Sequence, residues 1–70
     1  MKYVGVKQVL KAVKEGAVQK VYIGKDAEEH ILADLIKTCI DNNIEIIKIE
    51  TMAELGKLAG IEIGASTAAE

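Results

Sequence analysis

Seven short segments alternate between strand-like and helix-like spacing of apolar residues, and this alternation most limits the folds open to the chain. The strand-like segments are residues 3–4, 18–23 and 44–49, with a last one at the end of the stretch 61–69. Helical spacing covers residues 6–15, 27–41 and a short segment between Thr51 and Gly60. The order predicts a three-layer α/β/α sandwich with a mixed sheet of about four strands.

Boundary residues support this division. Gly16 supplies a stop for the first helix, and Asn42-Asn43 ends the second. Asp26 with Glu29 and Thr51 with Glu54 have the spacing of capping boxes, in which each side chain bonds the other's backbone N–H. We therefore predict that Asp26 opens the second helix and Thr51 opens the third.

The isoleucine-rich segment 44–49 is apolar at almost every position. Such a segment is typical of a strand buried on both faces, which predicts a place at the centre of the sheet. By contrast, residues 64–69 are nearly all small, and they would let a helix or a ligand approach the last strand closely.

Length and composition predict one domain, residues 1–70, with no cofactor and no metal site. The single cysteine, Cys39, cannot form an internal disulfide, and its place on an apolar helix stripe predicts a buried small hydrophobe. His30 has no set of ligand residues around it in the sequence. No nucleophile and base can be paired, so we expect no catalysis. The absence of a membrane span or signal-like segment predicts a cytoplasmic protein with no membrane partner.

Charge is distributed unevenly along the chain. Residues 1–25 carry six lysines and one glutamate, a balance of +5, whereas residues 26–70 carry three lysines and ten acidic residues, a balance of −7. The formal net charge of −2 therefore hides a basic region near the amino terminus.

The opening of the first helix, Gly5-Val6-Lys7-Gln8, concentrates that positive charge. Lys11 and Lys14 follow Lys7 at spacings of four and seven, so all three lysines share one side of the helix. Free N–H groups at a helix start attract anions, and a lysine there is electrostatically unfavourable until an anion arrives. A plain solvated lysine face remains the alternative interpretation.

Three strings together carry a family resemblance: Gly5-Val6-Lys7-Gln8 with Lys11, then Val21 to Ala27, then Glu54 to Ile61 running into Gly64-Ala65-Ser66. In this order they resemble the kink-turn RNA-binding ribosomal proteins of the L7Ae and L30e superfamily, and especially the small bacterial YbxF-like members. A kink-turn is an RNA bend built on tandem sheared G·A pairs beside a short bulge.

The resemblance implies roles for particular residues. Lys7 and Gln8, after Gly5, would read the edges of the G·A pairs, while Lys11 and Lys25 would contact phosphates. Helical spacing, rather than the resemblance, adds Lys14 as a further candidate RNA-binding residue on the same side of the helix. An extruded bulge nucleotide would pack on the loop formed by Ile61, Glu62, Ile63, Gly64 and Ala65.

We therefore expect a non-enzymatic protein whose partner is structured RNA, with ribosomal RNA as one candidate. The start of the first helix and residues 61–65 should then form one concave surface. The alternative is a protein–protein scaffold that forms homo-oligomers through an open strand edge or an uncovered sheet face.

Overall fold

The seven segments form in the order that the sequence predicts. The computed structural model describes residues 1–70, and its elements are β1 (Tyr3–Val4), α1 (Val6–Lys14), β2 (Lys20–Gly24), α2 (Glu29–Asp41), β3 (Glu45–Ile49), α3 (Met52–Ala59) and β4 (Thr67–Ala69). The strands form one sheet in the order β1-β4-β2-β3. Strand β4 is antiparallel to β1 and β2, while β2 and β3 are parallel. The predicted mixed four-stranded sheet is thus confirmed.

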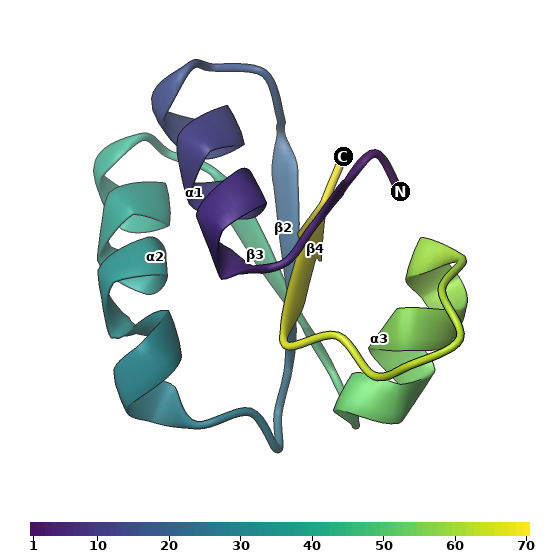
Figure 1. The fold of residues 1–70 in the computed structure, drawn as a ribbon. Coiled ribbons are helices and arrows are strands. Elements are labelled where there is room, and N and C mark those ends of the chain that lie inside the picture. Colours follow the sequence, from purple (N-terminus) through teal and green to yellow (C-terminus); the bar gives the residue numbers. More distant parts are fainter.

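Two helices cover one face of the sheet and one covers the other (Figure 1). A cluster of ten buried residues, including Val9, Leu35 and Cys39, fills the space under α1 and α2. A smaller cluster of Leu55, Ala59, Ala65 and Ala68 lies between the sheet and α3. The three-layer α/β/α sandwich is confirmed, with most of its core on the α1 and α2 side.

Strand β3 lies at the edge of the sheet, so its predicted central position is wrong. None of its residues is fully buried. Ile46 packs against the larger core cluster and Ile49 against the smaller one, so both faces of β3 are partly covered. This two-sided partial cover explains why an edge strand carries the nearly continuous apolarity of a central one.

The centre of the sheet is instead shared by β2 and the short strand β4. All three residues of β4 are fully buried, and they are small: Thr67, Ala68 and Ala69. The hydroxyl of Thr67 donates to the carbonyl oxygen of Tyr22 at 2.7 Å, which satisfies a polar group that would be costly to bury alone. As predicted, small side chains let helices approach this strand closely from both faces.

The apolar face of each helix is only partly buried. In α2, which begins at Glu29, two residues later than predicted, Leu32, Leu35 and Cys39 face the core. Burial raises the pKa of the Cys39 thiol, which fits its prediction as an inert hydrophobe. Large apolar side chains at the margins stay exposed, among them Ile31, Ile40 and Leu58. None of the three helices combines the length and apolarity needed to span a membrane.

Asp26 does not cap its own helix, which corrects the predicted capping box. The residue before α2 is Glu28, and no side chain caps that helix start. The Asp26 carboxylate instead accepts a hydrogen bond at 2.7 Å from the backbone N–H of Met52, the first residue of α3. At Thr51, the hydroxyl accepts from the N–H of Glu54 at 3.1 Å, so Thr51 caps α3 as predicted. Asp26 and Thr51 therefore both stabilise the start of α3.

Replacing Asp26 by alanine is expected to lower the free energy of unfolding by about 0.5 to 2 kcal/mol, the usual cost of losing a helix cap. The reason is that Asp26 bonds the positive end of α3 across 26 residues of sequence. Urea denaturation would measure the change, with Asp34→Ala, at an exposed acidic residue within α2, as the control. Equal losses in the two variants would contradict the assignment.

Candidate nucleic-acid interface

The predicted site residues gather mainly at one edge of the sheet, where β1, β2 and β3 end and β4 begins. Two backbone hydrogen bonds tie the neighbouring segments together there. The N–H of Gly5 donates to the Thr67 carbonyl at 2.9 Å, and that of Gly24 donates to the Ser66 carbonyl at 3.0 Å. We call the set Gly5–Gln8, Lys25 and Ile61–Ala65 the candidate edge.

The start of α1 presents free backbone donors beside exposed polar side chains. Gly5, the N-cap residue, has a φ of 97°, a conformation that suits glycine, and no side chain caps the helix. No acidic residue lies in the first turn. Lys7 and Gln8 are both exposed there, while Val9 and Val13 are buried beneath the helix. The first turn can therefore bind an anion or an acceptor-rich base edge.

The start of α3 shows the contrast. Its N–H groups bond to Asp26 and Thr51, and Glu54 lies in its first turn. Capping and acidic side chains thus already occupy that helix start, whereas the start of α1 has neither.

Lys11 and Lys14 lie farther along α1 and away from the candidate edge. Both are exposed. At 1.5 Å per residue, Lys14 lies roughly 10 Å along the helix axis from Lys7. The structure therefore brings Lys7 and Gln8 to the edge and leaves Lys14 near the opposite end of the helix.

Residues 61–65 form a loop held tightly against α3. The N–H of Ile61 donates to the Gly56 carbonyl and that of Ala65 to the Met52 carbonyl, each at 3.0 Å. A Cβ atom added at Gly56 would overlap the carbonyl oxygen of Ile63. The loop thus approaches α3 as closely as it does because residue 56 has no side chain.

This anchoring decides which loop side chains are available. Ala65 is buried in the smaller core cluster, and Ile61 packs against that cluster. Ile63 is 75% exposed, and Glu62 and Gly64 are also exposed. Ile63 is therefore the one large apolar side chain that the loop presents to solvent. The sequence alone did not show this division, because Ile61 and Ile63 are chemically identical.

Lys25, which lies just after β2 in the candidate edge, forms an ion pair. Its Nζ atom lies 3.2 Å from a carboxylate oxygen of Glu50, and both side chains are well exposed. A pair of this kind contributes little to stability, so an incoming phosphate could replace Glu50 at small cost.

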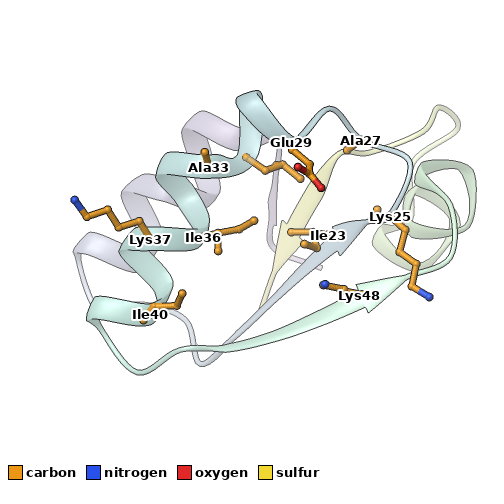
Figure 2. Close-up of a pocket in the computed structure, with 11 residues that line it drawn as sticks. Ile23, Lys25, Ala27, Glu29, Ala33, Ile36, Lys37, Ile40 and Lys48 are labelled. Atoms are coloured by element: carbon orange, nitrogen blue, oxygen red, sulfur yellow. The ribbon is translucent and has the colours of Figure 1, made fainter.

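The largest cavity lies elsewhere. It measures about 530 Å³ and is bounded by α2 and by β2 and β3, with Ile23, Ile36 and Ile40 along it (Figure 2). Lys25 is the only predicted site residue that lines it, and in Figure 2 the amino groups of Lys25 and Lys37 point away from it. This cavity does not include the start of α1.

The start of α1 and residues 61–65 share no cavity. A second, smaller hollow of about 290 Å³ includes Gln8 and Lys11 but no residue of the loop. The two segments flank the beginning of β4, one on each side of the sheet (Figure 1). The expected single concave surface is therefore not formed: the two segments lie at the same end of β4 but on opposite faces of the sheet (Figure 1).

Other chemistry is sparse. No group of three or more His, Cys, Asp or Glu side chains is arranged to hold a metal ion. His30 is exposed and lies 3.2 Å from a carboxylate oxygen of Glu28. Tyr22 donates a hydrogen bond to Glu70 at 2.7 Å, and this bond raises the pKa of the phenol. These groups lie outside the candidate edge.

The fold and site place this protein among mixed four-stranded α/β/α sandwiches, with an uncapped helix start and a glycine-anchored loop at one end of the sheet. Within this class, the chain belongs to the ribosomal protein L7Ae/L30e/S12e/Gadd45 family, whose sequence model matches residues 3–70. The resemblance seen in the sequence is confirmed.

Two bacterial proteins and one solved structure illustrate the relationship. The chain is 51% identical over 67 residues to an RNA-binding protein of Caldanaerobacter subterraneus subsp. tengcongensis, a match covering 96% of this chain and 82% of that protein. It is 32% identical to the RNA-binding protein YbxF of Geobacillus stearothermophilus, with 94% and 80% covered. The structure of the Giardia lamblia 15.5kD RNA binding protein superposes with a TM-score of 0.86 at 25% identity, over 94% of this chain and 56% of that one.

Proposed function

We propose that this protein binds kink-turn RNA through the candidate edge and catalyses no reaction. The observation that carries the proposal is the shared edge: the uncapped basic start of α1 and the loop 61–65 both lie beside the beginning of β4. Relatives that are named RNA-binding proteins support the choice of RNA as the partner. The RNA would be ribosomal or another structured RNA of the cytoplasm.

A bent RNA suits this edge for a physical reason. An A-form duplex hides its major-groove base edges in a deep, narrow groove, so specific proteins bind where the helix is opened or a base is extruded. Lys7 and Gln8 supply donors that match the O6 and N7 acceptors of guanine. The free N–H groups of the first turn add further donors at the same place.

The loop would contact the extruded nucleotide. Ile63 offers an exposed apolar surface, and Gly64 beside it adds no bulk. The backbone bonds of Ile61 and Ala65 fix this surface before RNA arrives, which lowers the entropy lost on binding. Shape capture, rather than stacking on aromatic rings, would then supply the contact.

The distribution of charge also favours RNA binding at the candidate edge. The first fourteen residues contain four lysines and no acidic residue. Lys11 would contact a phosphate next to the kink, and Lys25 a second one after releasing Glu50. Each such contact adds roughly 0.7 to 0.9 to the slope of log affinity against log salt.

The proposal is tested by titrating the protein with a kink-turn hairpin and with a copy whose G·A pairs are changed to Watson–Crick pairs. We expect the altered RNA to bind at least about tenfold more weakly, because each well-placed base contact contributes about 1 to 3 kcal/mol. Equal affinities at several salt concentrations would leave only nonspecific attraction between charges.

Self-association as a scaffold is the less favoured alternative. The β3 edge is open, but its exposed residues are Glu45 and Lys48, and charged side chains at an edge oppose strand pairing between copies. The other edge, β1, is only two residues long. A dimeric mass in solution that Lys48→Glu converts to a monomeric one would favour the scaffold.

A further inference from the structure

A second basic surface lies beside the candidate edge, in the groove between β1 and α1. The groove encloses about 290 Å³ and is lined by Lys2, Tyr3, Gln8, Lys11, Ala12 and Glu15. Gln8 and Lys11 come from α1, whereas Lys2 and Tyr3 come from the opposite wall at β1. None of the family motifs noted in the sequence includes Lys2 or Tyr3.

The ammonium group of Lys2 lies near the ring of its neighbour, Tyr3. The Nζ atom lies 5.8 Å from the centre of the Tyr3 ring, within the range of a cation–π interaction. Tyr3 is itself partly buried against the larger core cluster, so the ring provides a fixed support. Lys2 therefore lines the groove while its ammonium group lies within reach of a partly buried ring.

The groove also connects to the candidate edge. Residues 8, 11 and 15 follow each other along one side of α1, so Gln8 lies nearest the edge and Glu15 farthest from it. Two lysines line the stretch between them, and the single acidic side chain stands only at the far end. A polyanion entering past Gln8 would therefore meet positive charge on both walls.

We propose that the RNA strand leaving the kink runs into this groove, with Lys2 and Lys11 contacting its phosphates from opposite walls. This inference rests on the proposed kink-turn function and extends its footprint to β1. Tyr3 acts as a positioning residue, because its ring holds Lys2 toward the RNA. Glu15 marks where the contact ends, since its carboxylate repels a further phosphate.

The test compares Lys2→Gln with Lys37→Gln, a control at an exposed lysine of α2. The probes are a kink-turn hairpin with two long helical arms and two versions in which one arm or the other is cut back to the kink. For the long-armed RNA at about 0.1 M salt we expect Lys2→Gln to bind roughly five- to tenfold more weakly and to lower the salt slope by about 0.7 to 0.9. The control should match the parent.

Shortening the arm that occupies the groove should remove the difference in affinity between Lys2→Gln and the parent. Tyr3→Leu should weaken binding of the long-armed RNA in the same way but less than Lys2→Gln does. Circular dichroism would verify that each variant is folded. Two results together would overturn the proposed groove contact alone: Lys2→Gln binds every RNA as Lys37→Gln does, and the parent protein still discriminates against the altered G·A pairs. A parent without that discrimination would overturn the proposed function instead.

Discussion

Replacing Gly56 by alanine is expected to lower the free energy of unfolding by about 1 to 3 kcal/mol, as overpacked sites usually do. In an open helix the same change would stabilise the protein by about 0.8 to 1 kcal/mol, because alanine favours helix more than glycine does. The new methyl group would instead overlap the Ile63 carbonyl and push the loop 61–65 away from α3. The sign of the change therefore reports whether this close approach exists.

Affinity for kink-turn RNA should fall in Gly56→Ala as well, because Ile63 would move with the loop. Gly64→Ala is the matched control for stability: its added Cβ would meet Met52 at 3.4 Å, an ordinary contact. Urea denaturation would give both free energies and titration would give the affinity. A Gly56→Ala protein more stable than its parent would show that the loop does not approach α3 as described.

Replacing Lys7 and Gln8 together by alanine is expected to cost the largest share of RNA affinity. Two base contacts at about 1 to 3 kcal/mol each would be lost, which corresponds to a drop of at least about 30-fold. Stability should stay equal or rise by a few tenths of a kcal/mol, since removing Lys7 takes a positive charge from the positive end of α1.

The comparison of the affinity lost for each of the two RNAs is more informative than the size of either loss. The double variant should bind the normal kink-turn and the copy with altered G·A pairs almost equally, because its base contacts are gone. Lys11→Ala should instead weaken binding to both RNAs and lower the salt slope. A double variant that keeps the parent's preference would show that these side chains do not read the G·A pairs.

The helices and their order could be predicted because apolar spacing is a local signal. Val9 and Val13, or Leu32 and Leu35, fall on one face whatever else the chain does. Positions within the sheet could not be predicted in this way. Ile46 and Ile49 suggested a central strand, although each is only half-covered by a different layer. Strand β4, which shares the centre with β2, is made of small residues that carry little pattern of their own.

The candidate site likewise has features that local sequence spacing predicts and features that only the packing of distant segments determines. The exposure of Lys7, Gln8 and Lys11 follows from helical spacing. The role of Asp26 does not, because the spacing to Glu29 indicates a local cap, whereas its actual partner is 26 residues away. Likewise, the place of Ile63 depends on Gly56, and only the packing of two segments on each other shows that link.

The central place of β4 also has a consequence for a nascent chain. Tyr3–Val4 has no strand partner other than Thr67–Ala69, so the first strand made must wait for the last. At about 5 to 20 residues per second, translation imposes a delay of roughly 3 to 13 seconds. Throughout that delay the amino-terminal segment has no strand with which to pair.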